Sequence, residues 1–559
     1  MPRIALPSFP VRSAPGLVGA LLAILAVAGS EPLRGQEPPV PMGSSPPRVV
    51  ERDGRFALMV DDAPYLMLVA QANNSSNYPA ALPAVWAAVE DLHANTLQMP
   101  IAWEQVEPVE GRFDFSFLDT LLVQAREREV RLILLWFATW KNNSPKYAPE
   151  WVKLDNDRFP RVITREGEQR NSLSPVHRAT LDADRTAFTA LMRHLAEVDP
   201  QHTVIMVQPQ NETGTYGSVR DYSPTAERFF RDPVPAELVE AMDRTPGSWA
   251  EVFGEDADEF FHAWHIARFV DQLAAAGKAI HPLPMYVNAA QRDPINEQDP
   301  LTYSSGGPTH NVLDVWKVGA PTIELIAPDI YMREHQNVMA VLGHYARPDN
   351  PLFVAEIGSD TAYARYLFPV LGMGGLGFAP FGTDYTGYAN YPLGAKQVTA
   401  ETLEPFAENF RVLAPMAREW ARLALEAEVW GVAKPDDGAD QVLDLGRWQA
   451  TIQYDQWQFG MEEWFPDADR PDFADRPVGG AVIARLGPDE FLVIGRYARV
   501  SFTLRDPDPA QHSMMVRVEE GRYEDGEWVM QRVWNGDQTD YGLNFTDRPV
   551  VLRVKLGIY

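Results

Sequence analysis

Eight short apolar runs alternate with longer helix-forming stretches between residues 65 and 384, and no other feature of the sequence constrains the fold as strongly. The runs are Leu66–Ala72, Thr96–Trp103, Arg131–Trp140, Thr203–Asn211, Pro284–Ala289, Ile323–Tyr331, Leu352–Ile357 and Leu376–Gly382. Continuous apolar runs are typical of strands buried on both faces, and helical stretches between them favour parallel strands. Eight such units over about 320 residues predict an α/β fold, a (β/α)8 barrel spanning residues 49–400.

The alternative architecture is an open, doubly wound parallel sheet. That fold predicts a glycine-rich phosphate-binding turn after the first strand. Residues 71–75 occupy this place and read Gln-Ala-Asn-Asn-Ser, without a glycine. The sequence therefore favours the closed barrel.

The sequence pattern changes after residue 400. A helix-favouring stretch over residues 404–427 is followed by short alternating runs with turn signals, of which Asp525-Gly526 and Asn535-Gly536 predict hairpins. Residues 401–559 are therefore expected to form a helical connector and an all-β, sandwich-like domain. Structural support of the barrel is the role we expect for this domain.

The first 30 residues have the pattern of a secretory signal peptide. Arg3 and Arg12 accompany an apolar run over residues 17–28 that is short for a membrane span, and residues 26–28 form a small-residue cleavage site. A Pro-rich linker over residues 31–48 follows. We expect an exported protein, periplasmic or extracellular, and an uncleaved N-terminal anchor is the alternative.

Composition excludes several classes of function. The chain has no cysteine, so it has no disulfide, thiolate zinc site or iron–sulfur cluster. Its 49 Lys and Arg residues against 77 Asp and Glu residues give a net charge of −28, which disfavours nucleic acid and anionic membrane surfaces as partners. Aromatic residues make up 11% of the chain and offer flat surfaces for sugars.

Two of the expected strands end in glutamate. The fourth run ends in Asn211-Glu212, and the seventh reaches Glu356. Active sites of such barrels lie at the C-terminal ends of the strands, and a carboxylate buried there is costly unless it is paired or functional. Glycoside hydrolysis uses two carboxyl groups that face each other across a barrel mouth. One protonates the leaving oxygen, and the other attacks the anomeric carbon. A structural ion pair is the alternative for each glutamate.

Three segments carry a family resemblance. Residues 204–217 place a glycine-containing turn after Asn211-Glu212, residues 107–115 read Glu-Pro-Val-Glu-Gly-Arg-Phe-Asp-Phe, and residues 381–384 read Phe-Gly-Thr-Asp. They resemble signatures of glycoside hydrolase family 35, the β-galactosidases, after the fourth, second and eighth strands. The second segment also occurs in family 42. The resemblance covers residues 56–384.

The resemblance implies a retaining enzyme in which Glu212 is the general acid/base and Glu356 the nucleophile. It also implies that Asn211 binds the sugar hydroxyl next to the anomeric centre. Two departures concern galactose recognition. Residues 138–140 read Ala-Thr-Trp where the family has a galactose-binding glutamate between alanine and tryptophan, and the family's tyrosine after the first strand has no clear counterpart.

Further polar and aromatic side chains at or near strand ends are candidates for substrate binding, with core packing or a structural role as the alternative for each. They are Tyr331, Trp103, Trp136, Trp140, Asn288, Asp384 and Glu107. We expect Tyr331 to orient Glu356, the tryptophans to stack on sugar faces, and the remaining side chains to bind hydroxyl groups.

Together these observations predict an exported, retaining, exo-acting β-glycosidase. A β-galactosidase that releases terminal non-reducing β-D-galactose by double displacement is the first choice. Another specificity on the same barrel (glucosidase, arabinosidase, mannosidase) and a non-catalytic carbohydrate-binding protein are the alternatives. The expected partner is a neutral carbohydrate, with no nucleic acid, no stable membrane insertion after signal removal, and neither a metal nor an organic cofactor. The oligomeric state stays open.

Overall fold

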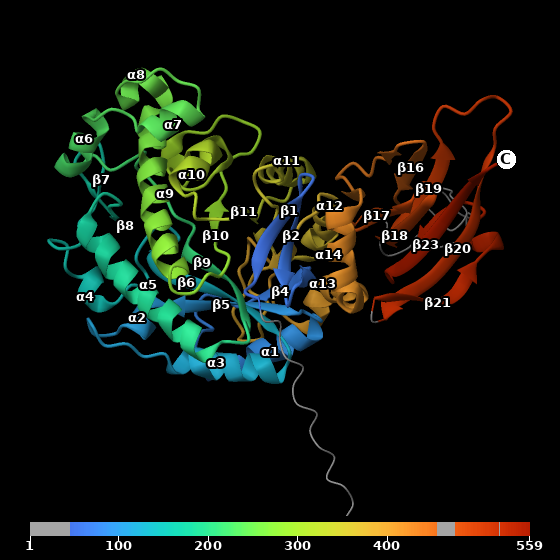
Figure 1. Ribbon diagram of the computed structural model, residues 1–559, viewed down its shortest axis with the longest axis horizontal. Helices are drawn as coiled ribbons and strands as arrows, with labels where there is room; N and C mark the ends of the chain where they lie inside the picture. The colour runs from blue at the N-terminus through green and yellow to red at the C-terminus, as the bar shows by residue number, and fades with distance from the viewer. Residues whose placement is uncertain (1–44, 456–475, 525) are drawn as a thin grey trace, which may run out of the picture. The chain divides into compact units, whose positions relative to one another are not determined.

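The computed structural model describes residues 45–455, 476–524 and 526–559 (Figure 1). The predicted signal peptide, residues 31–44 of the predicted linker and Asp525 of a predicted hairpin turn lie outside the described residues. Within the described part of the chain, no helix is both long and apolar enough to cross a bilayer.

Eight parallel strands form a closed barrel, in the order β10-β11-β12-β13-β4-β5-β6-β9. The two end strands of this list meet where the amide of Val207 donates to the carbonyl of Pro284 (3.0 Å). The strands are β4 (Met67–Gln71), β5 (Thr96–Ala102), β6 (Arg131–Lys141), β9 (Val204–Asn211), β10 (Tyr286–Ala290), β11 (Leu325–Ile330), β12 (Val354–Ile357) and β13 (Gly377–Pro380). Each overlaps one predicted run, so the predicted barrel is confirmed and the open sheet is wrong.

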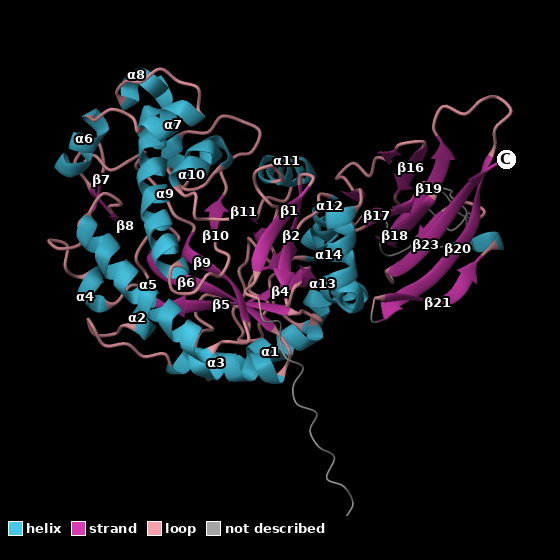
Figure 2. Cartoon of the chain, in the orientation of Figure 1, coloured by secondary structure: helices cyan, strands magenta, loops and turns pink. Residues whose placement is uncertain are grey.

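Helices surround the barrel, as the cyan elements of Figure 2 show. They include α1 (Leu82–Asp91), α3 (Ser116–Glu127), α5 (Arg178–Val198), α9 (Ala257–Lys278), α10 (Leu313–Gly319), α11 (His335–Tyr345) and α12 (Leu367–Gly372), with short helices α2 (Trp103–Val106) and α4 (Glu150–Lys153). Alternate side chains of each strand serve two cores. In β6, Ile133 and Leu135 point into the barrel, whereas Leu134 and Trp136 belong to the layer between strands and helices. This double burial explains why the strand sequences are continuously apolar.

A three-stranded antiparallel sheet that the sequence analysis did not predict precedes the barrel. It contains β1 (Arg48–Arg52), β2 (Arg55–Val60) and β3 (Ala63–Tyr65). Leu58 and Val60 pack in the same apolar cluster as the inward side chains of the barrel strands. This sheet therefore covers the end of the barrel at which the strands begin. Arg48, the last residue of the predicted linker, is the first residue of β1.

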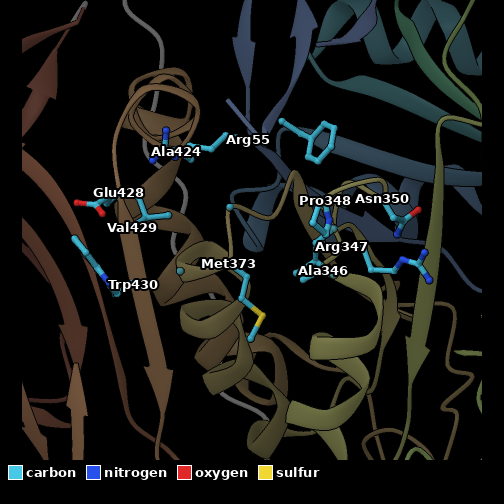
Figure 3. Close-up of a pocket in the computed structure, with 15 residues that line it drawn as sticks. Arg55, Ala346, Arg347, Pro348, Asn350, Met373, Ala424, Glu428, Val429 and Trp430 are labelled. Carbon is cyan, nitrogen blue, oxygen red and sulfur yellow. The ribbon is translucent and has the colours of Figure 1, made fainter. Parts of the chain in front are cut away.

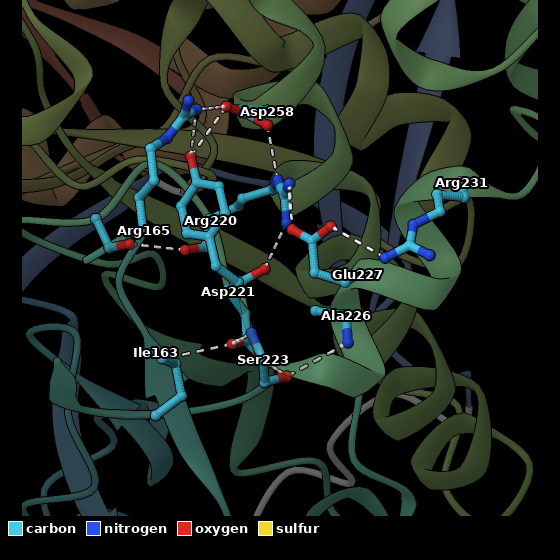
Figure 4. A network of polar contacts seen from close by, with 11 residues as sticks. Ile163, Arg165, Arg220, Asp221, Ser223, Ala226, Glu227, Arg231 and Asp258 are labelled. Carbon is cyan, nitrogen blue, oxygen red and sulfur yellow. Dashed lines mark hydrogen bonds and ion pairs between the residues drawn. The ribbon is translucent and has the colours of Figure 1, made fainter. Parts of the chain in front are cut away.

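A long excursion separates β9 from α9 and carries α6 (Pro224–Arg231), α7 (Ala236–Ala241) and α8 (Trp249–Phe253). The buried Arg220 anchors it, because its guanidinium donates to Asp258 (2.6 Å) and Glu227 (2.7 Å) and lies 4.0 Å from the ring centre of Tyr222 (Figure 4). Asp221 accepts hydrogen bonds from Ser174, next to the small hairpin of β7 (Arg161–Ile163) and β8 (Gln169–Leu173), and from Ser223. The segment that follows Glu212 is thus tied to the barrel wall.

The C-terminal region has two helices, α13 (Ala400–Leu413) and α14 (Ala417–Glu426), and then only strands and one short 3-10 turn among its described residues. One antiparallel sheet contains β14 (Val429–Ala433), β17 (Gly480–Gly487), β18 (Glu490–Arg496), β23 (Val550–Ile558), β20 (Ser513–Glu524) and β21 (Glu527–Trp534). The other contains β15 (Gln441–Leu445), β16 (Trp448–Gln453), β19 (Ala498–Leu504) and β22 (Leu543–Phe545).

The two sheets share one apolar cluster, to which Trp448, Ile483 and Phe545 belong. The predicted all-β domain is confirmed. The hairpin predicted at Asn535-Gly536 is wrong, because a 3-10 turn follows β21 there and β22 pairs with β19 in the other sheet.

Two glycines allow α12 to lie directly against β14. A Cβ atom on Gly431 would lie 2.0 Å from the carbonyl oxygen of Phe368, and one on Gly372 would lie 1.9 Å from the backbone nitrogen of Gly431. Real side chains do not tolerate such distances, and backbone atoms on both sides leave no room to adjust. Close backbone contact between α12 and the first strand of the β domain therefore requires glycine at both positions.

We predict that Gly431→Ala lowers the free energy of unfolding by about 2–3 kcal/mol, because the added methyl group forces the helix and strand apart. Gly343→Ala is the matched control: Gly343 lies in α11 with no atom within 4 Å of an added Cβ. The control should stabilise the protein by about 0.5–1 kcal/mol, since alanine favours the helix. Urea unfolding of both variants measures the difference. Equal stability of the two variants would contradict the close-packing argument.

Candidate active site

A cavity of about 320 Å³ opens at the end of the barrel where the strands finish. Residues at or just after the ends of seven strands line it, among them Asn74, Lys141, Glu212, Tyr331 and Glu356. Chemistry in barrels of this kind is performed at this end, by side chains from several strands. The cavity is therefore the candidate site.

A larger hollow, of about 440 Å³, lies at the opposite end of the barrel, beside β2 and β14 (Figure 3). Asn350 and Leu352, which precede β12, line it together with Arg55 and Trp430. Glu428 is its one carboxylate, and it is paired with Arg485 at 2.7 Å. Without a second acidic group this hollow offers no acid–nucleophile pair, so size alone does not mark the site.

Three buried carboxyl groups meet in the smaller cavity. Glu212, Asp329 and Glu356 each place one oxygen within 4.8 Å of an oxygen of the others, and the three side chains are buried. The structure thus brings together the two glutamates that the sequence analysis placed at strand ends. It adds Asp329, a residue of β11 that the sequence analysis did not single out.

Neutral donors hold the side chain of Glu356. Its Oε1 accepts a hydrogen bond from Nε2 of Gln71 (2.8 Å) and a longer one from Nδ2 of Asn211 (3.5 Å). Its Oε2 accepts a hydrogen bond from the hydroxyl of Tyr331 (2.8 Å). These bonds come from β4, β9 and the end of β11, so three strands fix one carboxylate. The predicted contact between Tyr331 and Glu356 is present.

The backbone, rather than the side chain, of Glu212 is held in place. Its φ of 44° lies in the left-handed region, which is uncommon for a residue other than glycine. Its amide donates to Oδ1 of Asn288 (2.9 Å), and its carbonyl accepts from the amide (3.2 Å) and Nδ2 (2.9 Å) of Asn143. This turn aims the carboxyl group into the cavity, where it remains available to a ligand.

Burial and neighbouring charges raise the pKa of two of the three carboxyl groups, Glu212 and Asp329. Burial raises the pKa of Glu212 to about 7, an effect that the negative charge of Glu356 increases and the nearby ammonium of Lys141 opposes. Burial, with Glu356 and Glu212 close by, also raises the pKa of Asp329 well above its usual value. Glu212 therefore carries a proton in a substantial fraction of molecules near neutral pH, which is the property that a general acid needs.

Lys141 and Asn211 form the contact that links β6 to β9 at the cavity. Nζ of Lys141 donates to Oδ1 of Asn211 (2.6 Å) and lies 3.9 Å from Oε2 of Glu212. Lys141 follows the alternation of β6, in which Ile133, Leu135 and Phe137 face the barrel interior, so its side chain points inward. The pairing of β6 with β9 is irregular between Trp136 and Lys141, and within this stretch Thr139 turns to the outer face.

The same alternation explains why the predicted contacts of Trp136 and Trp140 with a sugar are wrong. Trp140 packs edge-on against Phe269 of α9 (4.8 Å), and Trp136 donates to Asp184 of α5 (2.8 Å), so both lie in the outer layer. Trp103 is also buried outside the cavity, where its Nε1 donates to Glu107 (2.8 Å). These three rings are core residues and do not reach a sugar.

Three further candidates have structural roles. Glu107 accepts hydrogen bonds from Trp103 and from the amide of Gly111 (2.7 Å), within the turn after β5. Asn288 positions Glu212 and donates to Asp329 (2.7 Å), so both ends of its amide are occupied. Asp384 lies outside the cavity lining and joins the loops after β4 and β13. For Asn288 and Asp384 the predicted role as hydroxyl partners is therefore replaced by positioning.

Gln71, Lys141 and Asp329 are the site residues that sequence reasoning missed. Each is a polar side chain inside or directly after an apolar run, and a search for such residues could have found them. Thr139, which stands where family 35 has its galactose-binding glutamate, donates to Asp184 on the outer face and is absent from the cavity lining.

Three carboxylates are also the kind of ligand set that a hard cation prefers. In this cavity, however, Lys141 already brings positive charge to within 3.9 Å of Glu212, and both oxygens of Glu356 accept hydrogen bonds. The donor set therefore fits a cluster that shares protons better than it fits a cation site.

Comparison with known proteins points to glycosidases. Residues 86–262 match a family model described as β-galactosidase, that of glycoside hydrolase family 42, and residues 406–546 match a domain of unknown function, DUF5597. The sequence comparison with family 35 is thereby corrected to family 42, which shares the element over residues 107–115. The match includes Glu212 and ends before Glu356.

The curated relative and the solved structures are distant. β-Galactosidase BgaA of a Thermus species is 26% identical over 164 residues, which cover 27% of this chain and 23% of the relative. The solved structures of the β-galactosidases of Bacillus circulans sp. alkalophilus and Marinomonas ef1 are each 12% identical to this chain, with TM-scores of 0.48. Each match covers 65% of this chain, and it covers 61% of the first enzyme and 62% of the second.

We predict that Asp384→Asn lowers the free energy of unfolding by about 2–4 kcal/mol, because at least two buried donors lose their acceptor. The carboxylate accepts from the amide and Nδ2 of Asn73, the hydroxyl of Ser76, and the amide and hydroxyl of Thr386. The control Asp506→Asn changes a side chain that is 91% exposed, and it should have no measurable effect. Unfolding by urea tests both. Unchanged stability of Asp384→Asn would mean that the carboxylate does not join the loops.

Proposed function

We propose that this chain is a retaining β-glycosidase of the β-galactosidase type. One observation carries the proposal: two buried carboxyl groups from β9 and β12 face one cavity, and their environments differ. Glu212 has a pKa near 7, whereas the side chain of Glu356 is held by hydrogen bonds from neutral donors. Pairs of carboxyl groups in unlike environments are the means by which such enzymes obtain an acid and a nucleophile at one pH.

In the first step, a carboxylate oxygen of Glu356 attacks the anomeric carbon of the sugar while Glu212 gives its proton to the glycosidic oxygen. The bond from the anomeric carbon to the leaving group breaks as the bond to Glu356 forms. Gln71 and Tyr331 hold the attacking carboxylate in place through their hydrogen bonds. The products of this step are the free alcohol and a glycosyl ester on Glu356.

In the second step, Glu212 is ionised and takes a proton from water, which attacks the same carbon and releases Glu356. In the first step the negative charge moves from Glu356 to Glu212, and in the second step it returns to Glu356. The proximity of their oxygens, within 4.8 Å, supports a covalent intermediate over an inverting reaction, which needs carboxyl groups about 6.5–9.5 Å apart.

Galactose as the sugar is supported by the family 42 match over residues 86–262 and by the similarity to BgaA. Another specificity is the second candidate, because Thr139 faces away from the cavity while Lys141 points into it. The sugar is then selected by side chains other than the glutamate that family 35 uses. For the substrate we propose terminal β-D-galactose of oligosaccharides or polysaccharide fragments.

We also propose that the protein acts outside the cytoplasm, in the periplasm or the medium. The support is the signal-like pattern of residues 1–30. A polysaccharide fragment met outside the cell is a substrate consistent with that location.

We predict that the protein hydrolyses p-nitrophenyl β-D-galactoside faster than the corresponding glucoside, arabinoside or mannoside. Glu356→Gln should reduce kcat/KM by at least about 10⁴-fold for every leaving group, because no nucleophile remains. Glu212→Gln should lower the kcat/KM of methyl β-galactoside about 10²–10⁴-fold but spare the nitrophenyl substrate, whose leaving group needs no proton. Initial rates over the panel measure these ratios.

The matched control is Glu104→Gln, a change in a part-exposed carboxylate that pairs with Lys153 outside the cavity. Its kcat/KM should stay within about twofold of the wild type. Faster cleavage of another glycoside would replace galactose by that sugar. If the wild type cleaves none of the panel, the catalytic proposal fails and the carbohydrate-binding alternative takes its place.

A further inference from the structure

We propose that Lys141 is a positioning residue of this site: its ammonium group decides which end of the Asn211 amide faces the sugar. The inference rests on the proposed function and adds a residue to it. Lys141 ends β6 and is almost fully buried, with 3% of its side chain exposed. Its ammonium lies 4.9 Å from the ring centre of Phe137, which faces the barrel interior.

The hydrogen bond between Lys141 and Asn211 has one possible direction. An ammonium group only donates, so at 2.6 Å the atom of Asn211 that meets it must be the carbonyl oxygen Oδ1. The other end of the amide, Nδ2, then points towards Glu356, 3.5 Å from Oε1. In the reversed amide, two groups of donors would face each other without an acceptor. Lys141 therefore excludes the reversed orientation.

This orientation matters for the substrate. With Nδ2 beside the nucleophile, Asn211 offers a donor to the hydroxyl group next to the anomeric carbon, at the point where charge changes during the reaction. Hydrogen bonds to that hydroxyl group strengthen in the transition state of glycoside hydrolysis. A neutral residue in place of Lys141 would leave the amide free to rotate, so part of this stabilisation would be lost.

Lys141 also acts on Glu212 by charge. The groups that face Glu212 are Lys141 from β6, Lys146 from the following loop, Asp329 from β11, Tyr331 after β11, Glu356 from β12 and Tyr216 from the segment after β9. Lys146 is exposed, so solvent screens its charge, whereas Lys141 is buried. Lys141 is thus the principal cation that opposes the two neighbouring carboxyl groups.

The test compares Lys141→Met with Lys146→Met as the matched control. Each variant is assayed on two substrates, the nitrophenyl glycoside of the sugar that the wild type prefers and the same glycoside without its 2-hydroxyl group. The intrinsic reactivity of the two substrates is the same for every variant, so a change in the ratio of their kcat/KM values reports the contact with the hydroxyl group. Lys141→Met should reduce the wild-type ratio by about tenfold or more, and Lys146→Met should leave it unchanged.

A pH profile gives a second readout. The alkaline limb of kcat/KM should lie near pH 7 in the wild type, because Glu212 must be protonated to act as an acid. Removing the cation disfavours the ionised form of Glu212, so in Lys141→Met the limb should move to higher pH by roughly half a unit or more. Lys141→Arg keeps the charge and the donors, and it should restore both the ratio and the limb more fully than Lys141→Gln does.

Combination with Asn211→Ala makes the test specific. In that background Lys141→Met should have no further effect on the ratio, because no amide remains to be oriented. The proposal is overturned if Lys141→Met folds and keeps the wild-type ratio, or if it changes the ratio equally with and without Asn211. Should Lys141→Met fail to fold, Lys141→Gln carries the same comparison. Absence of wild-type activity would instead contradict the proposed function. In that case a crystal structure of Lys141→Met in which Nδ2 of Asn211 keeps its contact with Glu356 would overturn the inference by itself.

Discussion

The close approach of three buried carboxyl groups is the constraint on which the site depends. Glu212, Asp329 and Glu356 come from β9, β11 and β12, and their oxygens lie within 4.8 Å of one another. Like charges at that distance in a buried place repel strongly, so the cluster persists only because protons, donors and a cation offset the repulsion. The raised pKa values of Glu212 and Asp329, the three donors to Glu356 and the ammonium of Lys141 belong to one arrangement.

The rest of the fold keeps this arrangement rigid. The small N-terminal sheet covers the far end of the barrel, and the ion pairs of Arg220 hold the excursion that follows Glu212. Behind the site, Asp184 of α5 accepts hydrogen bonds from Trp136, Thr139 and Gln210, which tie the irregular end of β6 to β9. Burial raises the pKa of Asp184 to about 6 although these donors lower it. One buried carboxyl group thus holds three side chains from β6 and β9 behind the site.

Much of the fold could be predicted from the sequence, because each barrel strand is buried on both faces and therefore reads as a continuous apolar run. Glu212 and Glu356 could be placed at the mouth for the same reason, since each follows such a run. The pairing irregularity in β6 could not be predicted: it depends on the neighbouring strand β9 and leaves no mark in the residues themselves. It turns Thr139 to the outer face, whereas Trp140 and Lys141 follow the alternation of Leu134 and Ile133, which the sequence analysis did not apply to the tryptophans. Asp329 left a signal, a charge inside an apolar run, that the search for strand ends did not cover.

The most direct test of the central claim is the detection of a sugar bound covalently to Glu356. The protein is incubated with an activated 2-deoxy-2-fluoro-β-glycoside of its preferred sugar, which forms the glycosyl ester faster than water can cleave it, and the adduct is mapped by peptide mass spectrometry. We expect one added glycosyl group per chain, on the peptide that contains Glu356, and none in Glu356→Gln. Turnover without an adduct, or an adduct on another residue, would contradict the assignment of Glu356 as the nucleophile.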